Sequence, residues 1–324
     1  NIQYNWIELT EIANLLRELS SVGLHAIQTS GKATRNITAD PLSGLTEGEI
    51  ADARPYCELI RRWFNLHPEF SWLPGKFKIA INGAKFDETA LRIHDLGLRL
   101  VRNKEGELGF TVYVGGGLGA AAMVAAETVS FVPVEDILSY LESAMRIYNL
   151  KGRRDHLKKL RIKFLVRELG AEEYSRLVDE DWQQTRDDPD LKLNLTHLSE
   201  LEKDFALPIK PLALDVFEDK VDFNYSIWKK NNVRAHKISG HSIVNVSLTK
   251  LGAAPGDATS EQMRILADLA DQYGYSELRT TKRQTIVFPH VRKDQVFDLW
   301  QSLEKYGLAS PHQGTLAQIV ACPG

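Results

Sequence analysis

Two lysines, Lys76 and Lys78, lie two residues apart in the stretch KFKIAI, where charged and apolar residues alternate. Side chains at positions i and i+2 of a strand point to the same face, so Phe77, Ile79 and Ile81 would line a packed face. The lysines would then form a pair of neighbouring ammonium groups. The alternation alone favours a solvated strand face. Two like charges held together could instead bind an oxyanion and lower each other's pKa.

Arg35 lies in the polar segment TSGKATRNIT, which on its own is typical of a surface loop. A predicted strand further along ends in Gly115, Gly116 and Gly117. Glycines at a strand end let the backbone approach a bulky or anionic ligand closely. The G-x-G-x-x-G spacing of a dinucleotide site is absent, and no acidic residue closes a following strand.

A run of cationic side chains, KGRRDHLKKLRIK, occupies residues 151–163 at the start of a predicted helix. Such a run is usually a solvated face or a nucleic-acid patch. No aromatic residues are interleaved with the cations, so the run alone does not indicate nucleic-acid binding.

The bulk composition is that of an ordinary soluble protein. The chain has 324 residues, 43% hydrophobic and 26% charged, with a formal net charge of -3. Nothing in this charge balance demands a nucleic-acid or membrane partner, so we expect neither. No apolar run approaches the roughly 20 residues needed to cross a bilayer, and we expect a cytoplasmic location. Two cysteines, Cys57 and Cys322, are too few for a disulfide framework or a complete metal site.

An internal repeat relates residues 1–24 to residues 285–308, with apolar positions and a Gly-Leu pair matching without a gap. Each copy is predicted to be a strand followed by a helix, with Thr10 and Asp294 as N-caps. Gly23 and Gly307 occupy the position expected for a C-terminal glycine.

The second copy follows a predicted strand, 241–248, and a predicted capped helix, 259–274. This βαβα order indicates a ferredoxin-like α+β half-domain. The first copy begins at Asn1 without that preface, so we expect the chain to be an internal fragment of a longer protein.

The region between the copies has a different pattern. It contains predicted strands at 76–81, 96–102 and 109–114, with a hairpin turn at 103–106, and predicted helices at 134–149 and 156–169. Residues 186–222 are charged and weakly periodic, which predicts a linker.

Taken together, these segments resemble the siroheme- and iron-sulfur-containing nitrite and sulfite reductases, most closely the hemoprotein (beta) subunit branch of bacterial sulfite reductases. TSGKATRNIT is similar to the family's S-G-N-x-x-R-N block, and LPGKFKIAINGA to L-P-R-K-F-K-I-A-x-N-G-A. GFTVYVGGGLG matches the family's glycine block. NIQYNW resembles the segment that follows the family's T-x-R-Q motif, and ACPG resembles the start of its cluster motif A-C-P-G-x-x-x-C. Gly75 and Lys32 depart from the family's usual arginine and asparagine.

The resemblance implies an α+β fold in which two ferredoxin-like half-domains pair into one domain, with an inserted mixed α/β siroheme-contacting domain. The implied domains are an end of the first half at 1–45, a siroheme-binding domain with linker at 46–222, the second half at 223–308 and a truncated cluster domain at 309–324.

The resemblance also implies roles for individual residues. Cys322 would be the first of four cluster cysteines, so this chain alone would not complete a 4Fe-4S cluster and the isolated fragment would be inactive. The implied catalytic residues are Arg35, Lys76 and Lys78, and the implied cofactor-binding residues are Gln3, Arg35, Asn36, Gly115, Gly116, Gly117, Arg153, Arg154 and Lys163.

The implied activity is the six-electron reduction of sulfite to sulfide at siroheme coupled to a 4Fe-4S cluster, with a flavoprotein reductase or ferredoxin as electron donor. Reduction of nitrite to ammonia and a non-catalytic tetrapyrrole-binding module are the alternatives. The family's sulfite-type members keep lysine at the position of Lys78, whereas plant-type nitrite reductases carry asparagine there. The sequence therefore favours sulfite over nitrite.

Overall fold

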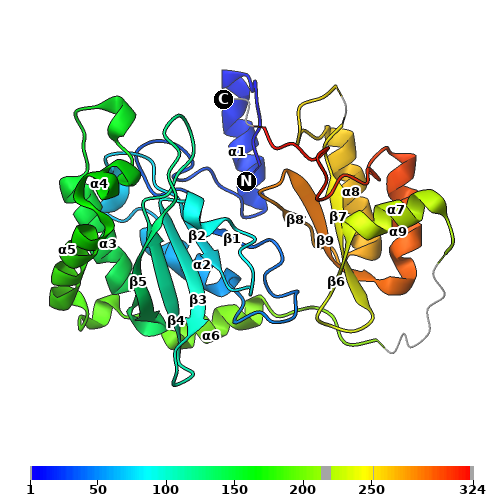
Figure 1. The fold of residues 1–324 in the computed structure, drawn as a ribbon. Helices are drawn as coiled ribbons and strands as arrows, with labels where there is room; N and C mark the ends of the chain where they lie inside the picture. The colour runs from blue at the N-terminus through cyan, green and yellow to red at the C-terminus, as the bar shows by residue number, and fades with distance from the viewer. Residues whose placement is uncertain (1, 213–219, 251, 322–324) are drawn as a thin grey trace. The chain divides into compact units, whose positions relative to one another are not determined.

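A five-stranded sheet and a four-stranded sheet form the centres of two units of the chain in the computed structural model (Figure 1). The structure describes residues 2–212, 220–250 and 252–321. Unit 1 comprises Asn1–Ala39 and Ile50–Phe205, and unit 2 comprises Asp40–Glu49 and Ala206–Gly324. The four domains and the pairing of two half-domains proposed from the sequence stay predictions.

The sheet of unit 1 has the order β1-β2-β3-β4-β5. Strands β1, β2 and β3 are mutually parallel, and β4 and β5 continue the sheet in antiparallel fashion. The predicted hairpin is confirmed between β3 and β4, with a turn closed by a bond from Gly106 N–H to the Asn103 carbonyl. The bounds are β1 Thr38–Ala39, β2 Ile79–Asn82, β3 Leu96–Arg102, β4 Leu108–Val114 and β5 Ala126–Pro133.

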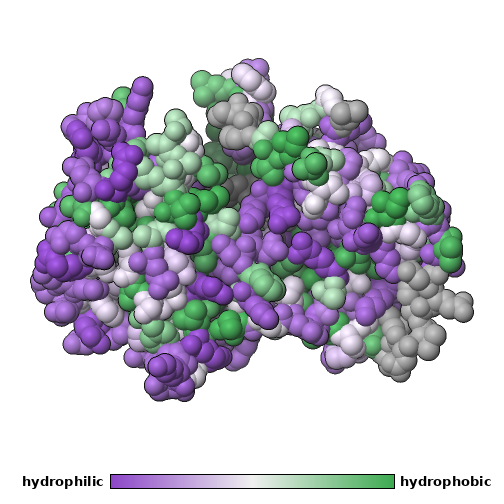
Figure 2. Space-filling view, viewed as in Figure 1, coloured by the Kyte–Doolittle hydropathy of each residue, from purple (hydrophilic) through white to green (hydrophobic). Residues whose placement is uncertain are grey.

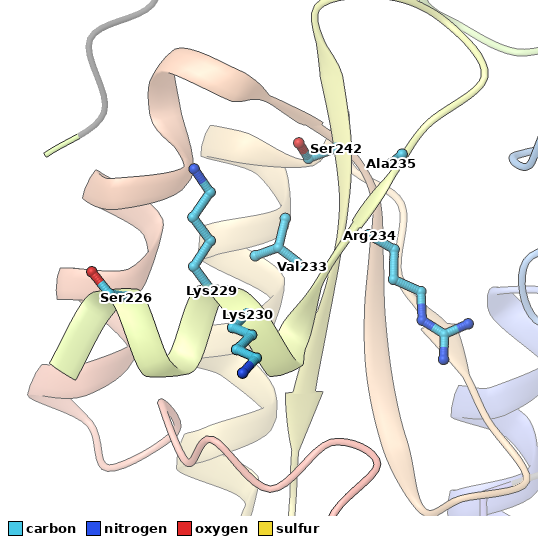
Figure 3. Close-up of a pocket in the computed structure, with 7 residues that line it drawn as sticks. All are labelled: Ser226, Lys229, Lys230, Val233, Arg234, Ala235 and Ser242. Atoms are coloured by element: carbon cyan, nitrogen blue, oxygen red, sulfur yellow. The ribbon is translucent and has the colours of Figure 1, made fainter. Parts of the chain in front are cut away.

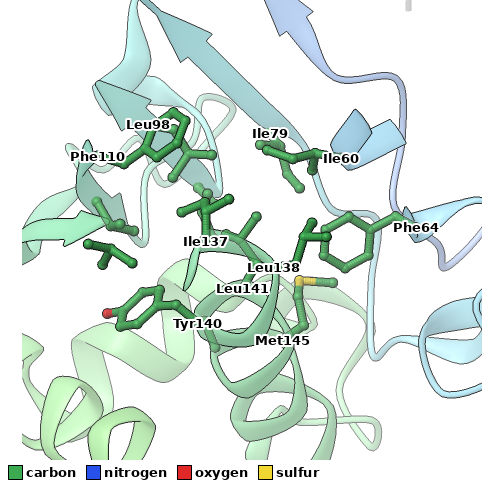
Figure 4. Close-up of a cluster of buried hydrophobic side chains, with 14 of the residues drawn as sticks. Ile60, Phe64, Ile79, Leu98, Phe110, Ile137, Leu138, Tyr140, Leu141 and Met145 are labelled. Carbon is green, nitrogen blue, oxygen red and sulfur yellow. The ribbon is translucent and has the colours of Figure 1, made fainter. Parts of the chain in front are cut away.

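The core of unit 1 is built around the helix α3, Ile137–Lys151, which the sequence predicts over 134–149. One face of α3 carries Ile137, Leu141 and Met145, all fully buried, toward the apolar side chains of β2, β3 and β4 (Figure 4). Burying side chains of this size contributes about 1.5–3 kcal/mol each. The other helices of the unit are α1 Ile12–Ser21, α2 Arg54–Phe64, α4 Ile162–Leu169, α5 Ala171–Thr185 and α6 Leu195–Asp204.

Helix α5 separates the core from solvent. Tyr174 and Val178 are fully buried, four residues apart on one face. The opposite face carries charged side chains, and Figure 2 shows hydrophilic residues over this part of the surface. The helix is therefore an ordinary amphipathic cover.

The predicted linker at 186–222 is wrong for part of its length. Residues 195–204 form α6, whose Leu198 and Leu201 are buried in the core of unit 1. Asn194 caps this helix by accepting a hydrogen bond from the N–H of His197 at 3.0 Å. A short helix with only one apolar stripe has too weak a periodicity to be recognised against its charged neighbours.

Unit 2 has an antiparallel sheet in the order β6-β7-β9-β8. The predicted helix at 259–274 is confirmed as α8, with a capping box in which Thr259 and Gln262 bond each other's backbone N–H. The observed order is β7, α8, β8, β9, α9, so the single strand predicted between the two helices is instead an antiparallel pair, β8 and β9. The bounds are α7 Phe223–Asn232, β6 Val233–Ala235, β7 His241–Ser247, α8 Ser260–Tyr273, β8 Arg279–Thr280, β9 Thr285–Arg292 and α9 Val296–Lys305.

The internal repeat is visible in the helices of both copies. A three-residue 3-10 helix leads into α1 at Leu9–Glu11 and into α9 at Lys293–Gln295, at the same spacing. Both α-helices end in the same Schellman motif, with Gly23 and Gly307 at positive φ. The glycine prediction is confirmed in both copies.

Two local expectations for the repeat are wrong. Thr10 and Asp294 lie inside the 3-10 helices and cap neither α-helix. Asp294 instead binds the guanidinium of Arg292 at 2.6 Å. Residues 2–7 form no strand, and none of the described strands pairs with their backbone.

Three histidines of unit 2, His236, His241 and His290, are buried between β6, β7 and β9. The Nδ1 atom of His236 accepts the N–H of Ile238 at 2.8 Å, and its Nε2 lies 3.3 Å from Nδ1 of His290. The Nε2 of His290 lies 3.2 Å from Glu277. These contacts fit a relay in which Nε2 of His236 donates to His290 and Nε2 of His290 donates to Glu277. Burial, followed by the neighbouring His290 and His241, lowers the pKa of His236 to about 4.

Unit 2 is therefore expected to lose stability in acid. Folding favours neutral His236, so its contribution is complete above the unfolded pKa of about 6.5 and is lost as the pH falls toward 4, by roughly 3 kcal/mol. His236→Asn keeps an acceptor for the Ile238 N–H and removes this titration. Hydrogen exchange of the β7 and β9 amides at pH 7 and pH 5 should show a smaller loss in the variant. His156→Asn, at an exposed position, is the control, and equal losses in wild type and His236→Asn would refute the assignment.

None of the described helices is both long enough and apolar enough to span a membrane.

Candidate functional site

The topology of unit 1 brings the chemically interesting segments to one end of the sheet. The parallel strands β1, β2 and β3 all begin at this end, and the antiparallel β4 finishes there. Arg35 precedes β1, the two lysines precede β2, and the glycine block follows β4. The N-terminus of α4 contacts the same end through β4. Segments more than 100 residues apart therefore form one site.

Lys76 and Lys78 are exposed, whereas Phe77 between them is buried and packs 5.5 Å from the ring of Tyr148. The predicted alternation is confirmed, although regular strand pairing starts only at Ile79. Phe77 makes a single parallel bridge to Thr34. Burial lowers the pKa of Lys76, and the charges of Lys78, Arg161 and Arg35 lower it further.

Arg35 is fixed beside the lysines by its own backbone, because its N–H donates to the carbonyl of Phe77 at 2.7 Å. Its guanidinium donates to the carbonyls of Thr29 and Gly31. The buried Nε of Arg35 has no hydrogen-bond partner among the described residues. A buried donor without an acceptor is costly, so the protein leaves this atom unsatisfied.

Arg161 is a further cation of the site. It lies at the N-cap of α4 and donates to both carboxylate oxygens of Asp95 at 2.7 and 2.6 Å. The charge of Arg161 contributes to lowering the pKa of Arg35 and of Lys76. Four cations therefore lie at this end of the sheet with Asp95, which is fully buried, as an anionic partner.

The glycine block is packed against protein. A side chain at Gly116 would lie 2.4 Å from the His94 carbonyl oxygen and 2.5 Å from that of Arg92. A side chain at Gly117 would lie 3.3 Å from the Arg161 guanidinium. The glycines thus allow β4 to close onto the 92–94 segment and allow the Arg161 side chain to pass. Their contact with a cofactor stays a prediction.

The three cations of the 151–163 run that the sequence assigns to the cofactor have protein partners, as Arg161 does. The ammonium of Lys163 is almost completely buried and donates to the carbonyls of Leu118 and Ala121 at 2.9 and 2.7 Å. It therefore anchors the loop that follows the glycine block. Arg153 pairs with Asp155, and Arg154 donates to carbonyl oxygens including that of Trp72. Their cofactor roles stay predictions.

The remaining predicted residues lie at the surface or outside the described part of the chain. Gln3 is exposed in the segment before α1, and Asn36 is exposed next to Arg35. Cys322 lies outside the described residues. Within the part of the chain that the structure describes, no group of three His, Cys, Asp or Glu side chains could hold a metal ion.

Sequence reasoning missed the roles of Arg161, Asp95 and His94 at this site. Burial lowers the pKa of His94, the charge of Lys78 adds to this effect, and Nδ1 lies 3.0 Å from the Ala90 carbonyl oxygen, whose hydrogen bond raises the pKa. An isolated acid directly before a strand, in HDLGL, was the available signal for a buried carboxylate.

An open cavity of about 430 Å³ in unit 2 is a weaker candidate for an anion site. It is lined partly by Lys229, Lys230 and Arg234. Figure 3 shows the side chains of Lys229 and Arg234 pointing in different directions, so the cations do not converge. The sheet end of unit 1 has the better geometry.

Comparisons with known families match both parts of the chain. The family model "Nitrite and sulphite reductase 4Fe-4S domain" matches residues 30–186, which include all four cations of the sheet end and Asp95. The model "Nitrite/Sulfite reductase ferredoxin-like half domain" matches residues 250–306.

Individual relatives carry two kinds of name. The chain is 27% identical over its whole length to sulfite reductase (ferredoxin) 1 of Mycolicibacterium paratuberculosis, and covers 52% of that protein. It is 28% identical, again over its whole length, to the chloroplastic ferredoxin–nitrite reductase of Arabidopsis thaliana, of which it covers 51%. The chain thus spans about half the length of these relatives.

A solved structure supports the fold. The structure of the Mycobacterium tuberculosis NirA protein aligns with 96% of this chain and 50% of that chain, at a TM-score of 0.75 and 24% sequence identity.

Proposed function

Because the chain belongs to the siroheme- and 4Fe-4S-containing nitrite and sulfite reductase family, we propose that the full-length protein reduces sulfite to sulfide. The observation that carries the proposal is the convergence of Lys76, Lys78, Arg35 and Arg161 at one end of the sheet. Such a cluster suits a small oxyanion with two negative charges. Lys78 gives this site a charged donor where an amide would suit a singly charged anion.

The residues at the sheet end fit siroheme, a tetrapyrrole with eight carboxylates. The unpaired buried Nε of Arg35 is a donor without an acceptor, and the ammonium groups of Lys76 and Lys78 are exposed. Arg35, Lys76, Lys78 and Arg161 are the side chains that would hold the cofactor and the anion. When bound, siroheme with its cluster supplies the electrons.

The protein's own contribution is binding the anion and moving protons. Arg35 would orient the sulfite oxygens by paired N–H donors, as a planar guanidinium does. Lys76 has a lowered pKa and would donate protons as the anion loses its oxygens as water. Arg161 adds positive charge but would not donate a proton, because a guanidinium stays protonated.

The electron donor in this proposal is a ferredoxin, as the names of the relatives suggest. Nitrite reduction is the second candidate, because the Arabidopsis relative carries that name at similar identity.

The proposal is tested with purified full-length protein, reduced viologen, and sulfite or nitrite as the only acceptor. We expect sulfide formation with a higher kcat/KM than ammonia formation. Preference for nitrite would support the second candidate, and turnover of neither anion by protein loaded with cofactor would reject both.

A further inference from the structure

Asp95 joins three segments of the candidate site. Its carboxylate accepts two bonds from Arg161 and a third from the backbone N–H of Lys78 at 2.9 Å. Its carbonyl accepts the N–H of Gly115 at 2.9 Å. The start of β2, the glycine block and the N-terminus of α4 thus meet at one fully buried residue.

We propose that Asp95 is a positioning residue that holds Arg161 and the backbone of Lys78 in the geometry needed to bind the oxyanion. The inference rests on the proposed function and extends it to a residue that would not itself touch the substrate. A negative charge is otherwise misplaced beside an anion site, because it repels the ligand. The three hydrogen bonds that the Asp95 carboxylate accepts give this charge a reason to lie there.

The geometry supports positioning over simple charge balance. Two parallel bonds from one guanidinium fix its plane as well as its location, which a single contact does not. The third bond fixes the peptide unit between Phe77 and Lys78, from which the Lys78 side chain departs. Removing one partner of such a buried pair leaves the other uncompensated.

The two explanations predict opposite signs for anion binding. If Asp95 only balances charge, Asp95→Asn strengthens binding of a dianion. If Asp95 positions the cations, the same variant weakens it. Sulfate is a suitable probe because it is a dianion related to sulfite whose binding can be measured without turnover.

The experiment is calorimetric titration of sulfate into the full-length protein, comparing wild type, Asp95→Asn and Asp136→Asn. Asp136 is a matched control, because it is also a buried carboxylate of unit 1. It lies on the 3-10 helix before α3 and pairs with Lys192 instead of with a cation of the site. We expect Asp95→Asn to weaken sulfate binding about tenfold and Asp136→Asn to change it less than twofold. Unchanged or tighter binding by Asp95→Asn, or no sulfate binding by wild type, would overturn the proposal.

Arg161→Lys is the second variant, for the case in which Asp95→Asn does not fold. Arg161 is 19% exposed, and lysine keeps its charge but loses the paired bonds to Asp95. We expect about fivefold weaker sulfate binding, and unchanged affinity would overturn the proposal.

A pH profile provides a readout that a purely structural role would not move. The charge of Asp95 raises the pKa of Lys76, opposing the charges of Lys78, Arg161 and Arg35. Without it, the alkaline limb of the sulfite kcat/KM profile should move to lower pH.

Failure of this inference is distinguishable from failure of the proposed function. Protein that binds sulfate in an Asp95-dependent way but reduces neither anion would reject the function alone. Protein that reduces sulfite but binds sulfate equally well with Asp95→Asn would reject the positioning role alone.

Discussion

Replacing Lys78 with asparagine in the full-length protein is expected to lower kcat/KM for sulfite about a hundredfold, and to lower kcat/KM for nitrite by less. Loss of one charged contact to the transition state commonly costs about 3 kcal/mol, which is roughly a hundredfold in rate. The loss is larger for sulfite because Coulomb attraction doubles with a dianion. The side chain of Lys78 is exposed and its backbone bond to Asp95 does not depend on it, so the fold should survive.

Lys104→Asn is the matched control for this prediction. Lys104 is an exposed lysine of the same unit, in the turn between β3 and β4 at the opposite end of these strands from the cation cluster. Its replacement should leave both activities within twofold of wild type. Equal losses for sulfite and nitrite in Lys78→Asn would remove the main support for the sulfite assignment.

Gly116→Ala is expected to destabilise unit 1 by about 3 kcal/mol and to impair anion turnover with it. The added methyl group would lie 2.4 and 2.5 Å from two carbonyl oxygens, so the end of β4 must move. That movement would disturb Gly115, whose N–H binds the Asp95 carbonyl. Hydrogen exchange of the β3 and β4 amides measures the loss of stability.

Gly119→Ala separates crowding from backbone strain. A methyl group at Gly119 meets no atom within 4 Å, but the residue has φ +95, so alanine there costs about 1–2 kcal/mol. The loss at Gly116 should therefore exceed the loss at Gly119. If Gly116→Ala destabilises unit 1 no more than Gly119→Ala does, the 92–94 segment can shift to make room for the methyl group at little cost in stability.

The alternation around Phe77 and the positions of Gly23 and Gly307 could be predicted from the sequence because they depend on local chemistry. An apolar residue between two lysines predicts opposite faces whatever the partner strand is. A glycine after an amphipathic helix predicts a left-handed backbone conformation at that position, because the Cβ atom of any other residue makes this conformation sterically unfavourable.

The pairing of Arg161 with Asp95 could not be predicted in the same way. These residues are 66 positions apart and meet only because the start of β3 lies beside the start of α4. In the basic run every cation has the same local pattern, and only the fold shows that Arg161 acts on Lys76 while Lys163 anchors a loop. Long-range contacts of this kind depend on topology, which local periodicity does not contain.

In the proposed function, Arg35, Lys76 and Lys78 together bind the substrate oxyanion. The most direct test is a crystal structure of the full-length, cofactor-loaded protein with sulfite bound. We expect sulfite oxygens within hydrogen-bond distance, about 3 Å, of side-chain nitrogens of all three residues. Sulfite bound without contact to any of the three would contradict it.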